Sequence, residues 1–122
     1  MKTTLSDLVD QIKSHPGYPG AGMILCHNGV VRESSREGRK VSGLEISVDH
    51  ARLAQILEEQ KKRPGILDIL VEINENRKLV VGDDVMYLVV AGDIRENVLA
   101  VLTDTLNLIK SEVTDKTQFY TE

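Results

Sequence analysis

A group of cationic residues follows a short apolar segment early in the chain. The apolar run from Met23 to Cys26 leads to Asn28-Gly29, a pair typical of turns and bulges, and four cations crowd the next stretch: Arg32, Arg36, Arg39 and Lys40. Together with Glu33 and Glu37, residues 32–40 carry +4 − 2 = +2, whereas the whole chain carries −4. A local positive charge on an acidic protein suits a small anion, such as a phosphate ester, better than a long polyanion. The alternative is a solvated, flexible charged turn.

Two arginines are the best candidates for anion binding. A guanidinium group presents a planar fork of donors that pairs with phosphate or carboxylate at two points, and Arg32 and Arg95 suit this task. The alternative for each is a surface ion pair with its neighbour, Glu33 or Glu96. Arg95 falls in the first turn of an expected helix, where a cation opposes the helix dipole, and this cost favours a functional role.

Lys110 is the candidate catalytic residue. One flank of the expected last helix carries Leu99, Leu102 and Leu106, and continuing this spacing reaches Lys110 at the rim of the buried face. Partial burial favours the neutral form of an amine, which can then transfer a proton or attack an acyl group. The alternative is a helix-terminal lysine that complements the dipole. Further candidates for the same anion pocket are Lys116, Arg36 and Arg39.

Other kinds of site find no support in the sequence. Cys26 lies in an apolar run and is interpreted as an inert buried residue, and a single cysteine excludes an internal disulfide. The three histidines lack the spacing of metal ligands, and no phosphate-cradling glycine motif occurs. Aromatic residues make up 3% of the chain, so stacking platforms for nucleic-acid bases are scarce. Without a membrane-spanning run or a signal peptide, we expect a cytoplasmic protein with no membrane partner.

Hydrophobic periodicity predicts the elements that must position these residues in one domain, residues 1–122. Helices are expected at Leu5–Ile12, after the N-cap Asp49, and from Ile94 to Ile109. Strands are expected at residues 23–27, 41–48, 67–73, 79–81 and 85–91. Residues 111–122 are mostly polar and are interpreted as a flexible C-terminal tail that a ligand or partner would order.

Two further details bear on packing. Thr4 with Asp7, and Asp93 with Glu96, form capping-box patterns at the start of the first and last helices. Residues 85–91 are apolar at nearly every position, so both faces of that strand must be covered. A helix on one face and a partner chain on the other would satisfy this pattern.

In this order of elements, the chain from Gly22 to about Thr117 resembles the large, catalytic subunit of molybdopterin synthase (MoaE). A family strand that ends in Thr-Gly-x-Val-Arg is similar to Asn28-Gly29-Val30-Val31-Arg32, and its Leu-x-x-Gly-Asp turn is similar to residues 79–83. A His-Arg pair of the family falls on Ile94-Arg95, and the lysine that follows fifteen residues later is Lys110.

The chain also departs from the family pattern. The histidine of the pair is Ile94 here, and a second His-Arg pair is replaced by Asn74-Glu75. The family tail Pro-x-Trp-Lys reads Thr114-Asp115-Lys116-Thr117, so its second lysine is either missing or displaced by one residue to Lys116. These changes indicate a divergent member.

The resemblance implies an α+β fold of the α/β hammerhead type, with an antiparallel-rich sheet and packed helices. It implies a homodimer that forms a heterotetramer with a small ubiquitin-like sulfur-carrier subunit (MoaD-like) ending in Gly-Gly. This partner would deliver sulfur as a C-terminal thiocarboxylate to an anionic pterin, cyclic pyranopterin monophosphate, in molybdenum cofactor biosynthesis. The resemblance implies no metal or organic cofactor.

Three functions are left open. The first is the catalytic subunit of a divergent molybdopterin synthase, in which Lys110 is catalytic and the substrate is bound by Arg32, Arg95, Lys116 and Arg39. The second is a binding or regulatory module that holds the small partner without turnover, which the missing histidine and the altered tail favour. The third is a structural dimer that binds an unrelated small anion.

Overall fold

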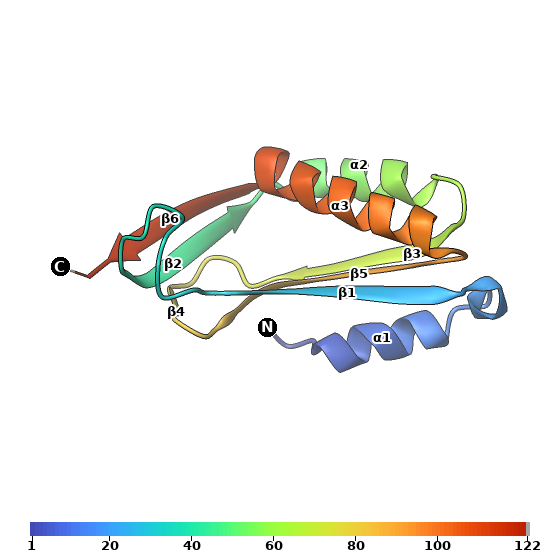
Figure 1. Cartoon of the computed structure of the whole chain (residues 1–122), viewed down its shortest axis with the longest axis horizontal. Helices are drawn as coiled ribbons and strands as arrows, with labels where there is room; N and C mark the ends of the chain where they lie inside the picture. The colour runs from blue at the N-terminus through green and yellow to red at the C-terminus, as the bar shows by residue number, and fades with distance from the viewer. Residues whose placement is uncertain (122) are drawn as a thin grey trace.

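Two three-stranded antiparallel sheets make up the framework of the computed structural model, which describes residues 1–121 (Figure 1). The first sheet has the order β1-β5-β3 and consists of β1 (Met23–Val30), β5 (Asp84–Gly92) and β3 (Ile66–Ile73). The second has the order β4-β2-β6 and consists of β4 (Leu79–Val80), β2 (Val41–Val48) and β6 (Thr114–Tyr120).

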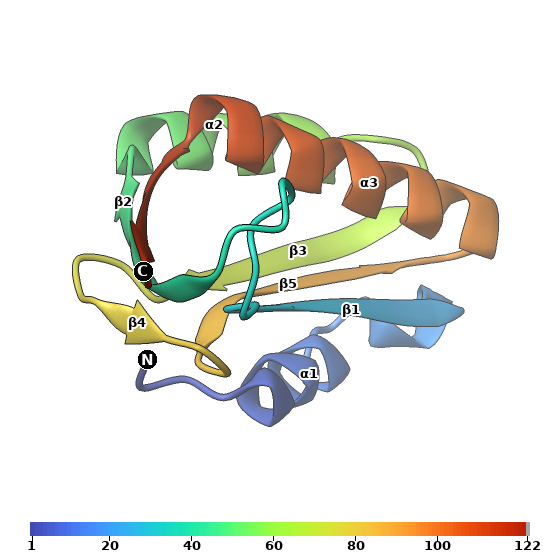
Figure 2. The ribbon, with the colours of Figure 1, turned by 60° about the vertical axis from the view of Figure 1, so that its left-hand side comes forward.

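Helices cover both faces of the first sheet. Two of them, α2 (His50–Lys61) and α3 (Arg95–Glu112), lie side by side on one face, and α1 (Leu5–Lys13) lies on the opposite face (Figure 1). A short 3₁₀ helix, η1 (Tyr18–Gly20), joins α1 to β1. The second sheet stands at one end of the first, beyond the C-terminus of α3 (Figure 2). The predicted α+β class with antiparallel sheets and packed helices is confirmed.

The central strand β5 is buried on both faces, as its continuous apolar sequence predicts. Toward α3, Leu88 and Val90 pack with Val98 and Val101, all of them almost fully buried. Toward α1, alternate residues of β5 pack with Leu8 and Ile12 of that helix. These β5 residues are Tyr87, Val89 and Ala91. The expectation that a partner chain covers this second face was therefore wrong, because α1 of the same chain covers it.

Two of the three predicted helix caps are confirmed. Thr4 and Asp7 form a reciprocal capping box, and the Asp49 side chain accepts a hydrogen bond from the backbone N–H of Arg52 at 3.0 Å. The capping box predicted at Asp93 was wrong, since Ile94 occupies the N-cap position of α3. Asp93 instead accepts hydrogen bonds from the Ile94 backbone N–H and the Asn97 amide, and these donors lower the pKa of its carboxyl group.

The C-terminal segment is part of the second sheet. Helix α3 continues to Glu112, and β6 follows almost at once and pairs with nearly the whole length of β2. Residues 114–120 are therefore ordered by this chain itself, in contrast to the expected tail that only a ligand or partner would order. The last residue of that expected tail, Glu122, lies outside the described residues.

Candidate functional site

The two sheets and the end of α3 enclose a cavity of about 410 Å³. Besides Gly29 and Thr114, its walls carry two kinds of side chain. The apolar ones come from β1, β2, β3 and β5, and they are Val30, Leu44, Ile46, Ile73, Val85 and Met86. The cationic or titratable ones are His27, Arg36, Lys110 and Lys116. No carboxylate lines this cavity within residues 1–121.

Each cationic side chain reaches the cavity from a different element. Ile109 is fully buried in the α3 interface, so the following residue, Lys110, emerges at the rim of that face. Lys116 lies on β6 opposite Ile46 of β2, and both line the cavity. Arg36 comes from the loop between β1 and β2, which rises toward the end of α3 (Figure 2). Three separate backbone segments therefore concentrate positive charge in one volume.

A bulge in β1 shapes the wall next to His27. The register of β1 against β5 shifts between Gly29 and Val30, so Asn28-Gly29 bends a continuing strand and does not end it. A Cβ atom added at Gly29 would lie 3.4 Å from His27 Nε2 and 3.4 Å from Met86 Cγ. Glycine therefore leaves room for the imidazole ring against the strand.

The electrostatic setting keeps His27 neutral. Partial burial lowers the pKa of His27 below its ordinary value, and the positive charge of Lys110 lowers this pKa further. Near neutral pH the cavity thus combines cationic side chains with one uncharged imidazole. Such a site can bind an oxyanion that carries an apolar body, and it can accept a proton.

The structure brings together only some of the residues predicted for the site. Lys110 and Lys116 line the same cavity, as does Arg36. Lys110 is exposed, whereas partial burial was expected. Arg39 does not line the cavity, and its guanidinium lies 3.8 Å from the centre of the Tyr120 ring in a cation–π contact.

The two arginines that were predicted as anion clamps lie elsewhere in the single chain. Arg32 is exposed, and its Nε donates a hydrogen bond to the backbone oxygen of Ser34 at 2.8 Å. Arg95 is also exposed, 3.9 Å from Glu96, in the first turn of α3. Fifteen residues of helix separate it from Lys110, which corresponds to about 22 Å. Within one chain, Arg95 and Lys110 therefore do not share the cavity.

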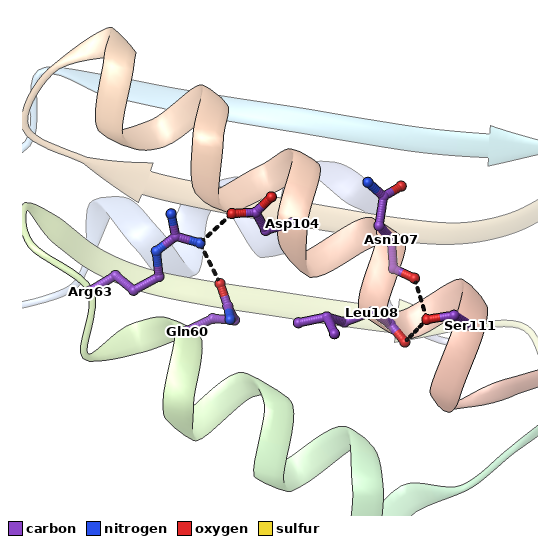
Figure 3. Close-up of a pocket in the computed structure, with 6 residues that line it drawn as sticks. All are labelled: Gln60, Arg63, Asp104, Asn107, Leu108 and Ser111. Carbon is purple, nitrogen blue, oxygen red and sulfur yellow. Dashed lines mark hydrogen bonds and ion pairs between the residues drawn. The ribbon is translucent and has the colours of Figure 1, made fainter.

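A second concavity, of about 360 Å³, lies between α2 and α3 (Figure 3). Its most basic residue, Arg63, follows α2, and its Nη1 donates to Gln60 Oε1 at 2.9 Å and to Asp104 Oδ2 at 2.7 Å. The Ser111 hydroxyl donates to the backbone oxygen of Asn107 (Figure 3). Because these groups already satisfy one another, this groove is a weaker candidate for an anion than the Lys110 cavity.

The sequence comparison identifies the family. The family described as MoaE protein matches residues 2–112, which is most of the chain. The chain belongs to the MoaE family. No curated protein sequence gives a significant match.

Solved structures with MoaE folds resemble the chain at low sequence identity. Molybdopterin cofactor biosynthesis protein E from Burkholderia multivorans has a TM-score of 0.77 and 21% identity, with 99% of this chain and 88% of that one covered. Molybdopterin synthase from Staphylococcus aureus has a TM-score of 0.71 and 23% identity, with 84% and 77% covered. A complex of subunits 1 and 2 of molybdopterin-converting factor from Helicobacter pylori has a TM-score of 0.71 and 15% identity, with 98% and 85% covered. These likenesses support the fold assignment.

His27 is the cavity residue that sequence reasoning missed in this MoaE protein. The histidines were considered only as metal ligands, and within residues 1–121 no group of three His, Cys, Asp or Glu residues is placed to hold a metal ion. Strand alternation carried the signal, since Met23 and Leu25 pack toward α3 and His27 follows on the same face. Cys26 points to the other face and is exposed, so its interpretation as a buried residue was wrong.

Proposed function

We propose that this chain transfers sulfur from a thiocarboxylated small subunit to an anionic pterin, with Lys110 as the catalytic residue. The observation that carries the proposal is the cavity itself, where Lys110, Lys116 and Arg36 face apolar walls and no carboxylate of residues 1–121 contributes. An oxyanion is attracted by the cations, and the apolar walls can hold the flat body of a pterin.

The MoaE family has a role in molybdenum cofactor biosynthesis as the large subunit of molybdopterin synthase, and this chain takes that role. The alternative of a binding module without turnover is not favoured. Its support was the missing histidine and the altered tail, yet Lys116 of that tail lines the same cavity as Lys110.

The role proposed for each cationic side chain follows from its position in the cavity. Lys116 and Arg36 hold the phosphate or carboxylate group by charge-assisted hydrogen bonds. The Lys110 amine, at the α3 end of the cavity, handles the proton or accepts the acyl group. Arg32 and Arg39 stay in the proposal as substrate-binding residues at the cationic loop. Arg95 can serve the cavity only from a second copy of the chain, which fits the proposed homodimer.

The proposed partner is a small MoaD-like subunit. A similar structure from Helicobacter pylori is a complex of subunits 1 and 2 of molybdopterin-converting factor, and it supports a two-subunit assembly for this chain. We place the C-terminal Gly-Gly of such a partner in the cavity, because its terminal carboxylate or thiocarboxylate is an anion and glycine needs little room.

Reconstitution tests the proposed function. The purified chain, mixed with a thiocarboxylated MoaD-like subunit and cyclic pyranopterin monophosphate, should form molybdopterin. Lys110→Ala should lower the rate by about 100-fold or more, as expected for the loss of a group that transfers a proton or acyl group. Lys13→Ala is the matched control, since Lys13 also lies in the last turn of a helix but on α1, away from the cavity. Equal rates for the two variants would remove Lys110 from the mechanism.

A further inference from the structure

His27 lines the cavity with an imidazole ring, a group whose charge ordinarily changes near neutral pH. Its side chain lies on the α3 side of β1, and within residues 1–121 neither of its ring nitrogens has a hydrogen-bond partner. The other two histidines are engaged: His15 Nδ1 accepts from the Gly17 backbone N–H at 2.9 Å, and His50 Nε2 pairs with Glu75 at 2.8 Å. The His27 ring is therefore available to a guest in the cavity.

The charges around His27 have one sign. Lys110 comes from α3, Lys116 from β6 and Arg36 from the loop after β1. The strands β2, β3 and β5 contribute apolar side chains to the cavity. With no carboxylate in the lining of residues 1–121, nothing in the empty cavity stabilises an imidazolium ion, and burial together with Lys110 lowers the pKa of His27.

We propose that His27 is neutral in the empty cavity and takes up a proton when an oxyanion binds beside Lys110. The cations of the empty cavity repel a protonated His27 ring, whereas a bound negative charge attracts it. The protonated ring then donates a hydrogen bond to the guest, in addition to the lysine and arginine donors. Histidine suits this part, because imidazole is the side chain whose charge ordinarily changes near neutral pH. The inference rests on the proposed function for the nature of the anion, which is either a phosphate ester or the carboxylate end of a partner.

The proposal predicts that the affinity of the cavity for an anion depends on pH. Ligand binding that takes up a proton is favoured as the pH falls toward the pKa of the empty-cavity histidine. A rise of about one unit in the His27 pKa, the low end of what an opposite charge at close range produces, corresponds to about tenfold tighter binding across that range.

Histidine ring resonances in NMR spectra of the full chain test the proposal between pH 5 and 8. Sodium sulfate stands in for a phosphate ester, and a short peptide ending in Gly-Gly stands in for the partner tail. The peptide is N-acetylated, so that neither probe titrates in this range, and sodium chloride at equal ionic strength is the blank. The His27 resonance, identified by its absence in His27→Gln, should titrate below pH 6.5 in the blank, and its pKa should rise with at least one probe. The probe that raises it identifies the source of the anion.

Variants separate the proposal from a general effect of pH. His27→Gln and His27→Phe should each remove the tenfold pH dependence of probe affinity measured by calorimetry, whereas His15→Gln should keep it. Lys110→Met should raise the His27 pKa in the blank, because it removes a positive neighbour. This last variant leaves the His27 side chain in place and therefore tests the proposal even where His27 variants fold poorly.

The possible failures are distinct. Probe binding without a change in the His27 titration would overturn the proton uptake and leave the proposed function standing. If neither probe binds, the proton uptake is overturned as well. The proposed function is then judged separately by product formation and by its loss in Lys110→Ala.

Discussion

Lys110 and His27 affect each other through charge, and this interaction explains why both are suited to the same cavity. The lysine lowers the pKa of the histidine, so one side chain is cationic while the other is neutral at the same pH. Two groups in different protonation states can divide the work of an acid and a base. An aliphatic residue at position 27 would leave the cavity with cations alone.

The depressed pKa of His27 predicts a pH effect on stability. The unfolded chain, with an imidazole pKa of about 6.5, binds more protons than the native chain between that pH and the lower native pKa. Stability contributed by the neutral ring is therefore present above pH 6.5 and is lost as the pH falls through this window. Urea unfolding at pH 7.5 and at pH 5.5 should show a larger loss for the wild type than for His27→Gln.

A matched control keeps this comparison specific. His15→Gln should lose as much stability as the wild type over the same two pH values. The aspartates whose pKa values are lowered, Asp7, Asp84 and Asp93, lie below their ordinary value of 3.8 and do not titrate in this range. Identical losses in wild type and His27→Gln would contradict the burial of a neutral ring at position 27.

At the scale of elements, α3 carries both the core of the first sheet and the catalytic candidate. Its buried stripe includes Val98, Val101 and Ile109, and Lys110 follows directly after this stripe. The same stripe contains Thr105, which is fully buried and whose hydroxyl oxygen has no hydrogen-bond partner within residues 1–121. An unsatisfied polar group inside a core reduces stability.

Replacing this threonine should stabilise the protein. Thr105→Val keeps the β-branched shape and removes the unpaired hydroxyl, so the free energy of unfolding should rise by about 1 kcal/mol. Chemical denaturation measures this change. Thr103→Val, at an exposed position of the same helix, is the control and should change stability little. A loss of stability in Thr105→Val would mean that the hydroxyl finds a partner in solution.

Most elements could be predicted because their apolar residues follow one clear period. The strand at Val41–Val48 and the cap at Asp49 were placed correctly, since alternation and capping are local properties. Strand β6 was not predicted, because Thr114 to Gln118 contain no apolar residue and the strand exists through its pairing with β2. The covering of β5 by α1 was also missed, since periodicity says that a face is buried but not what covers it.

The candidate site, like the fold, could be predicted from the sequence only in part. Spacing along α3 placed Lys110 at the rim of the helix, and family resemblance added Lys116, and both line the cavity. Arg32 and Arg95 were grouped with them by residue type and by the spacing of the family motifs, although helix geometry separates Arg95 from Lys110 within one chain. To predict His27 as a cavity residue, one must know which face of β1 packs against α3. That packing is a tertiary relation between elements distant in the sequence.

At the scale of the whole molecule, the cavity depends on how the second sheet is held against the first. Leu44 and Ile46 of β2 line the cavity and also pack with Ile73 and Val85 of the first sheet. Within the second sheet, Gly43 is the position where three strands meet, because it pairs with Val80 of β4 and with Phe119 of β6. A change at Gly43 should therefore affect both stability and the cavity.

Gly43→Ala tests this dependence. A Cβ atom at position 43 would collide with the backbone oxygen of Leu79, and backbone cannot move aside as a flexible side chain can. We expect the free energy of unfolding to fall by about 2 kcal/mol, as for other overpacked sites. Because β4 and β2 must separate, the wall formed by Leu44 shifts, and sulfate binding measured by calorimetry should weaken as well.

Gly20→Ala is the matched control, since a Cβ atom there meets nothing within 4 Å. A stability loss with unchanged sulfate affinity would show that the cavity tolerates a displaced second sheet, and it would place the anion nearer to Lys110 and His27 than to β2.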